Sequence, residues 1–81
     1  MTSQQVAYGI TADPIIQKAD RQLTQIIGAM ETARDSEKRN GYPDEFLEEL
    51  IARYNELWMP GVREVLGDEY VDAELKKYGV A

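Results

Sequence analysis

Four glutamates between residues 45 and 56 are the side chains whose type and spacing could support chemistry. They are Glu45, Glu48, Glu49 and Glu56. Two carboxylates can act as general acid and base when burial separates their pKa values. The sequence places these four on the polar side of an amphipathic helix, where a solvated face is the ordinary arrangement. The functional alternative is a docking face for a basic partner, because spaced negative charge resembles the phosphate backbone of a nucleic acid.

The rest of the chain offers little catalytic chemistry. It has no histidine and no cysteine, so the commonest metal ligands and the usual acid–base group near neutral pH are missing. Ser3 and Ser36 are its only serines, and no histidine can activate either of them. The six glycines are scattered and form no phosphate-binding loop. We therefore predict a protein that is not an enzyme and needs no metal, cofactor or small-molecule substrate.

Length and charge narrow the class of protein further. A chain of 81 residues predicts one domain, and 43% hydrophobic residues are too many for a disordered chain. The net charge of −6 argues against direct binding to nucleic acid or to an anionic membrane. The N-terminal residues lack the basic and apolar regions of a signal peptide, and no apolar run approaches the roughly 20 residues of a membrane span. We predict a soluble protein, cytoplasmic or part of a soluble assembly.

The glutamates belong to a helix predicted over residues 43–59. Its apolar residues cover an arc of roughly 140° on a helical wheel. They are Phe46, Leu47, Leu50, Ile51, Tyr54, Leu57 and Trp58. This arc is wider than one neighbouring helix can cover. We therefore predict that this helix is the centre of the fold, with a neighbour on each flank of its apolar face.

A longer helix is predicted over residues 14–39, starting with Asp13 as N-cap and Pro14 in the first turn. Its apolar residues follow the alternating spacing of three and four that is typical of a bundle helix or coiled coil. They are Ile16, Ala19, Leu23, Ile26, Met30 and Ala33, with Ile15 and Ile27 at the edges. Residues 40–43, Asn-Gly-Tyr-Pro, predict a tight turn, with Pro43 opening the next helix, so the two helices should form an αα-hairpin.

Two short helices are predicted at the C-terminal end, over residues 60–66 and 69–78. Pro60 should end the helix before it, and Asp68 should serve as N-cap for the last one. Residues 1–12 are either a frayed tail or an extended arm that lies on a partner. The predicted fold class is all-α. It is a long αα-hairpin with two short C-terminal helices packed on its free flank, within a single helical domain over residues 13–81, preceded by the N-terminal arm.

Two functions remain after these exclusions. The first is a non-enzymatic structural, assembly or accessory subunit that contacts itself or a larger protein complex. Its candidate interface residues come from the arm, the heptad seam and the aromatic edge of the second helix, although core packing is the alternative for the helical ones. They are Val6, Tyr8, Ile10, Ile16, Leu23, Ile27, Met30, Tyr54 and Trp58. The second function is an acidic inhibitor that binds a basic groove of an enzyme or nucleic-acid-binding protein through the four glutamates.

Overall fold

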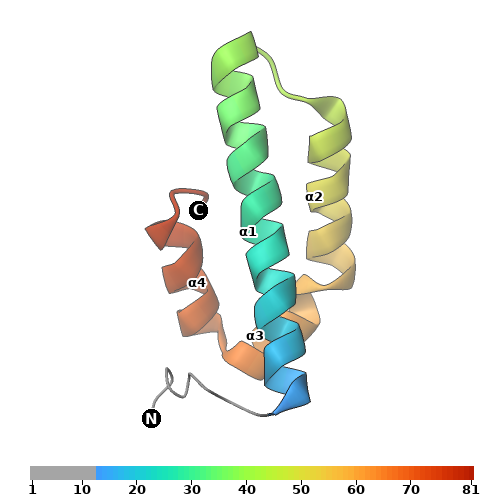
Figure 1. Ribbon diagram of the computed structural model, residues 1–81, viewed down its shortest axis with the longest axis vertical. Coiled ribbons are helices and arrows are strands. Elements are labelled where there is room, and N and C mark those ends of the chain that lie inside the picture. The colour runs from blue at the N-terminus through green and yellow to red at the C-terminus, as the bar shows by residue number, and fades with distance from the viewer. Residues whose placement is uncertain (1–12) are drawn as a thin grey trace.

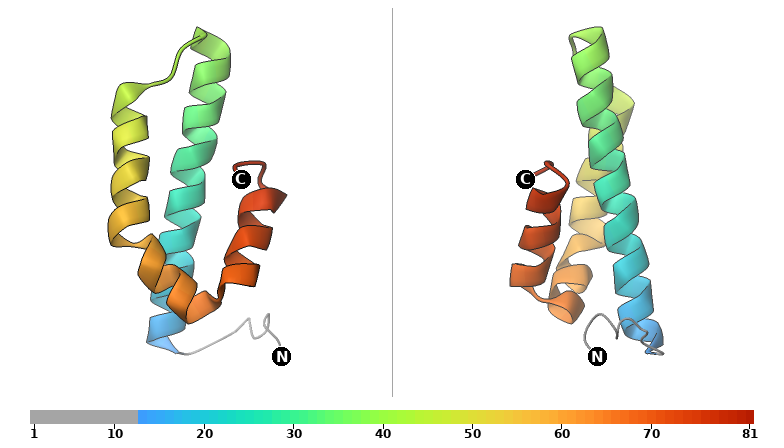
Figure 2. Two further views of the ribbon diagram at one scale, coloured as in Figure 1. Left: turned by 180° about the vertical axis from the view of Figure 1, so that it is seen from behind. Right: turned by 60° about the vertical axis from the view of Figure 1, so that its left-hand side comes forward.

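The computed structural model describes residues 13–81, and their regular structure is entirely helical (Figure 1). The helices are α1 (Pro14–Asn40), α2 (Glu45–Leu57), α3 (Met59–Leu66) and α4 (Asp68–Lys77). The all-α prediction is therefore confirmed. Helices α2 and α4 lie on two sides of α1, and α3 joins their lower ends (Figures 1 and 2). The predicted N-terminal arm lies outside the described residues.

Helix α1 sets the length of the molecule. The Asp13 carboxylate accepts a hydrogen bond from the backbone N–H of Ile15 at 2.9 Å, as expected of an N-cap. At the other end Gly41 has φ 83°, and its N–H donates to the Glu37 carbonyl at 2.8 Å. This left-handed conformation is accessible to glycine because it has no Cβ. With 27 residues at about 1.5 Å each, α1 is about 40 Å long, close to the 43 Å length of the molecule.

Helix α2 starts and ends at different residues from those predicted. Asp44 is its N-cap, and the carboxylate accepts hydrogen bonds from the N–H groups of Phe46 at 3.0 Å and Leu47 at 3.2 Å. Pro43 therefore precedes the helix instead of opening it. Trp58 separates α2 from α3, because Pro60 cannot continue the hydrogen-bond ladder of α2 and instead lies in the first turn of α3.

The predicted N-cap of α4 is wrong. Gly67 occupies that position with φ 91°, and Asp68 is the first helical residue. The C-terminal end forms a Schellman motif. The N–H of Gly79 donates to the Lys76 carbonyl and that of Val80 to the Leu75 carbonyl, each at 3.0 Å. Val80 packs against the core in consequence, so the last turn is joined to the rest of the fold.

The core lies between α1, α3 and α4. Its cluster of buried side chains consists of Leu23, Ile26, Ile27, Met59, Val62, Val71 and Leu75. Three of these, Ile26, Val62 and Val71, are fully inaccessible to solvent. Helix α2 contributes no buried residue. The prediction that α2 is the centre of the fold is therefore wrong, and α1, which contributes the most buried residues and lies between α2 and α4, has that role.

Candidate protein-interaction surface

One side of α2 presents large apolar side chains to solvent. Phe46, Leu50 and Leu57 lie within about 40° of one another around the helix, and we call them the outer stripe. Phe46 is 74% exposed and Leu57 is 70% exposed, whereas Leu50 is half-buried. Solvent-exposed apolar residues are common singly, whereas Phe46 and Leu57 project from the same side of one short helix, with Leu50 between them.

The side of α2 that faces the protein carries a different set of apolar residues. Leu47, Ile51, Tyr54 and Trp58 are half-buried. The rings of Tyr54 and Trp58 stack with their centroids 4.6 Å apart and an interplanar angle of 22°, and both pack against the core. Within residues 13–81 α2 packs against α1 and α3, but these two neighbours cover only part of its wide apolar arc and leave Phe46 and Leu57 exposed.

Carboxylates line one edge of the outer stripe. The helical period puts Glu45, Glu49 and Glu56 beside one another along this edge. Glu49 forms an ion pair with Arg53 at 3.5 Å, and both side chains are largely exposed. In the described part of the chain, no ion pair involves Glu45, Glu48 or Glu56. The edge is therefore an exposed acidic border with little internal neutralisation.

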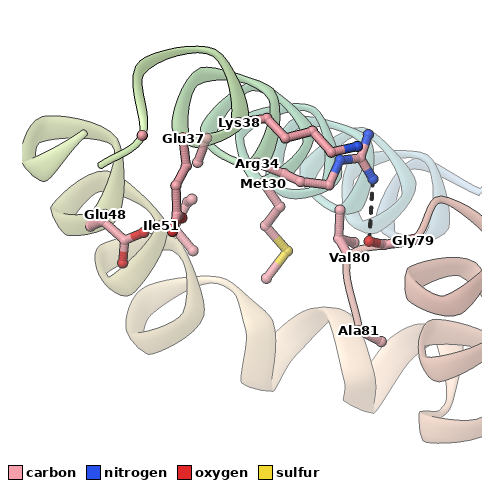
Figure 3. A pocket seen from close by; sticks show the side chains of 11 residues that line it. Met30, Arg34, Glu37, Lys38, Glu48, Ile51, Gly79, Val80 and Ala81 are labelled. Atoms are coloured by element: carbon pink, nitrogen blue, oxygen red, sulfur yellow. Dashed lines mark hydrogen bonds between the residues drawn. The ribbon is translucent and has the colours of Figure 1, made fainter. Parts of the chain in front are cut away.

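The fourth predicted carboxylate, Glu48, belongs to a separate feature. It lines an open groove of about 770 Å³ between α1, α2 and the C-terminal residues (Figure 3). The groove contains the apolar side chains of Met30, Ile51 and Val80 together with charged groups of both signs. Because the groove mixes charges of both signs with apolar side chains, its lining favours no single class of ligand.

Arg34 closes one wall of this groove. Its Nη1 donates hydrogen bonds to the Tyr78 carbonyl at 2.8 Å and to the Gly79 carbonyl at 3.2 Å (Figure 3). Its Nε also donates to Asp35 at 3.2 Å. These contacts join the C-terminal end to α1, so we assign Arg34 a structural role.

Two other side chains have displaced pKa values, and both lie away from α2. Burial raises the pKa of Tyr70, and the charges of Glu74 and Asp20 and the nearby Tyr78 raise it further. Hydrogen bonds from Arg63 to Asp72 at 2.9 Å and Asp68 at 3.1 Å raise the pKa of the Arg63 guanidinium. The Arg63 contacts hold α4 on α3.

The interface residues that the sequence predicts lie in different environments in the structure. Leu23 and Ile27 are in the core, and Met30, Tyr54 and Trp58 are half-buried against it. Ile16 is 36% exposed on α1. Val6, Tyr8 and Ile10 lie outside the described residues. The surface described here therefore consists of residues that were assigned to the interior. The signal that could have identified them is the width of the apolar arc of α2.

Comparisons with models of protein families, with curated proteins and with solved structures find no match. Within residues 13–81, no group of three or more acidic side chains is arranged to hold a metal ion. None of the helices in that range is both long enough and apolar enough to cross a membrane.

Proposed function

We propose that this protein is a non-enzymatic structural, assembly or accessory subunit that acts through protein–protein contacts made by the outer stripe. The observation that carries the proposal is the exposure of Phe46 and Leu57 on one side of a capped helix. Burying such a side chain contributes about 1.5–3 kcal/mol. Large apolar and aromatic residues at the centre of a contact often dominate its free energy.

The setting of the stripe supports this proposal. Phe46, Leu50 and Leu57 are presented by a helix, so their relative positions are fixed before a partner arrives, which lowers the entropy lost on binding. Substituting them should leave the core intact, because the buried cluster is built from residues of α1, α3 and α4. We further propose that the protein is soluble, cytoplasmic or part of a soluble assembly, and has no direct contact with nucleic acid or membrane. The support for this is the net charge of −6.

The test is site-specific photo-crosslinking of the full chain. A benzophenone amino acid replaces Phe46 in one chain and Ile15 in the control, since Ile15 is 64% exposed on a different helix. We expect irradiation to give an adduct with another protein chain from position 46 and much less from position 15. No intermolecular adduct from position 46, or equal yields from both positions, would contradict the proposal.

A second candidate function is an acidic inhibitor that occupies a basic groove. It is favoured by the exposed carboxylates Glu45, Glu48 and Glu56, which have no ion pair within residues 13–81. The two functions differ in their response to substitution. Changing all four predicted glutamates to Gln would abolish binding by an inhibitor, and Phe46→Ser would preserve it. A structural subunit should show the opposite order, with Phe46→Ser the more damaging change.

A further inference from the structure

The geometry points to a partner that presents a basic amphipathic helix and lays it along the outer stripe, with its cations over the acidic border. This inference rests on the proposed function and specifies the class of partner. Three features of α2 carry it: the shape of the stripe, the charge of its border and the poor match of α2 to a second copy of itself.

The shape of the stripe matches a helix. Phe46 and Leu57 are eleven positions apart, which is about 16 Å along the axis. The stripe is about 40° wide, the narrow seam that one helix buries on another. Arg53 lies about 20° outside the stripe on the side of the acidic border, and its ion pair with Glu49 holds the charged end toward that border. The aliphatic stem of Arg53 can then extend the apolar seam between Leu50 and Leu57.

The charge of the border selects the partner's flanking residues. Glu45, Glu49 and Glu56 follow the whole length of the stripe, with Arg53 as the one cation of α2. Lysine or arginine along one flank of the incoming helix would meet these carboxylates. Such pairs act mainly on the rate of association and on the choice of partner, whereas the apolar seam supplies affinity.

A second copy of the chain fits this surface less well. An antiparallel arrangement that packs Phe46 of one copy on Leu57 of the other brings Glu45 close to Glu56. A parallel two-fold arrangement places the two acidic borders on opposite sides of the seam. Only the antiparallel arrangement puts the borders together, but both bring together two molecules of net charge −6 and supply no row of cations to meet the border, which disfavours the association.

The experiment measures binding of a defined probe to the full chain. The probe is a synthetic peptide of about 18 residues, long enough to be helical, with leucine along a heptad seam and lysine on both flanks. The control peptide keeps the leucines and replaces the lysines with glutamate. We expect the lysine peptide to bind at least about tenfold more tightly in fluorescence anisotropy. Its affinity should fall about tenfold between about 50 mM and about 500 mM salt, because salt screens exposed charges.

Variants of the protein locate the binding. The double variant Phe46→Ser with Leu57→Ser should lower the affinity for the lysine peptide by about tenfold or more. The exposed control Ile15→Ser should change this affinity by less than about twofold. Glu45→Gln with Glu56→Gln removes two charges from the border. Glu64→Gln with Glu69→Gln removes two from α3 and α4 and changes the net charge equally. Only the border pair should weaken binding, by about three- to tenfold. Far-UV circular dichroism confirms that each variant is folded.

Several results would overturn the inference. Equal affinity of the two peptides would show that the partner helix need not be basic. Equal losses of affinity in the border pair and the control pair of variants would show that the acidic border takes no part in binding. A photo-crosslink from position 46 to residues 1–12 of the same chain would show that the chain covers its own stripe. Sedimentation that shows a dimer lost on Phe46→Ser would overturn the partner class but leave the proposed function standing. If the lysine peptide does not bind and position 46 gives no intermolecular adduct, both this inference and the proposed function are contradicted.

Discussion

At the scale of single residues, Tyr70 links the fold to the pH of the solution. It lies on α4, yet the carboxylate of Asp20 on α1 is one of the charges acting on it. Partial burial of the ring is the largest cause of its raised pKa, with Glu74 the next contribution. Both effects disfavour the phenolate in the folded protein, because one removes water and the other adds like charge.

The sign of the resulting pH dependence follows from linkage. The pKa of Tyr70 is higher in the folded protein than the ordinary value of 10.0, so the folded state binds this proton more tightly. The stabilisation is complete below pH 10 and is lost as the pH rises through the folded-state pKa. We predict that the free energy of unfolding in urea falls more steeply above about pH 10 in the natural chain than in Tyr70→Phe.

The matched control for that measurement is Tyr42→Phe, which removes a hydroxyl from an exposed ring outside the four helices. Identical pH profiles for the natural chain and Tyr70→Phe would contradict the assigned cause. Comparing variants removes the contribution of lysines, which also lose protons in this range.

Arg63 shows how one side chain can change the role of another. Asp68 could have capped α4, but its carboxylate accepts from Arg63 at 3.1 Å. The same guanidinium also reaches Asp72, one turn further along α4. Gly67 then takes the cap position without a side-chain hydrogen bond. Ion pairs this exposed contribute about 0–1 kcal/mol each, so their main effect is to orient α4 on α3.

At the scale of the helices, Gly28 lowers the stability of α1, since glycine is unfavourable in the interior of a helix. A Cβ built at this position would meet nothing within 4 Å, so no close contact requires glycine. We predict that Gly28→Ala stabilises the protein by about 0.5–1 kcal/mol, because alanine has less backbone freedom to lose on folding. The melting temperature should rise by several degrees, at roughly 4–8 °C per kcal/mol for a domain of this size.

Gly41→Ala provides the opposite case for the same measurement. A Cβ there also meets nothing within 4 Å, but the φ of 83° strains any residue with a side chain. This variant should lose about 1–2 kcal/mol. A loss of stability in Gly28→Ala would show that the glycine has a conformational role in α1 that its surroundings do not reveal.

The helices could be predicted from sequence because their ends depend on local chemistry. Asp13, Pro14 and Gly41 act within one turn of where they stand, and α1 ends one residue beyond the predicted position. Pro60 likewise separates α2 from α3 as expected. The errors occurred at two helix starts. Asp44 caps α2 in place of Pro43 opening it, and Asp68 is drawn to Arg63.

At the scale of the whole molecule, the buried cluster and the two most exposed large apolar side chains of residues 13–81, Phe46 and Leu57, lie on different helices. Ile26 is fully buried between α1, α3 and α4, whereas Phe46 is largely exposed on α2. We predict that Ile26→Ala lowers the free energy of unfolding by about 2–5 kcal/mol, a large share of the total for a small domain. Phe46→Ala should change it by less than about 0.5 kcal/mol.

Urea denaturation monitored by circular dichroism makes this comparison, with Val62→Ala as a second core variant, since Val62 is also fully buried. Equal losses in Ile26→Ala and Phe46→Ala would mean that the outer stripe is buried in the protein in solution. That result would direct attention to residues 1–12 or to a second copy as its cover.

The candidate surface was harder to predict than the helices because amphipathicity records how apolar a face is and not what covers it. The wide arc of α2 indicated two neighbours, but residues 13–81 cover only the side with Tyr54 and Trp58. The seam of α1 showed the converse. Its spacing suits either a partner or the protein's own core, and Leu23 and Ile27 proved to be in the core. Only the three-dimensional arrangement of α3 and α4 decides between these outcomes.

The absence of any buried residue in α2 has a consequence for its motions. Segments open locally at free energies that range from near zero to that of global unfolding, and those with few buried contacts open most readily. The amide hydrogens of α2 should therefore exchange with solvent through a local opening, well before those around Ile26 in α1. A molecule bound to Phe46 and Leu57 must hold this helix closed. Part of its binding energy would then appear as slower exchange along α2, the one helix of the four without a buried side chain.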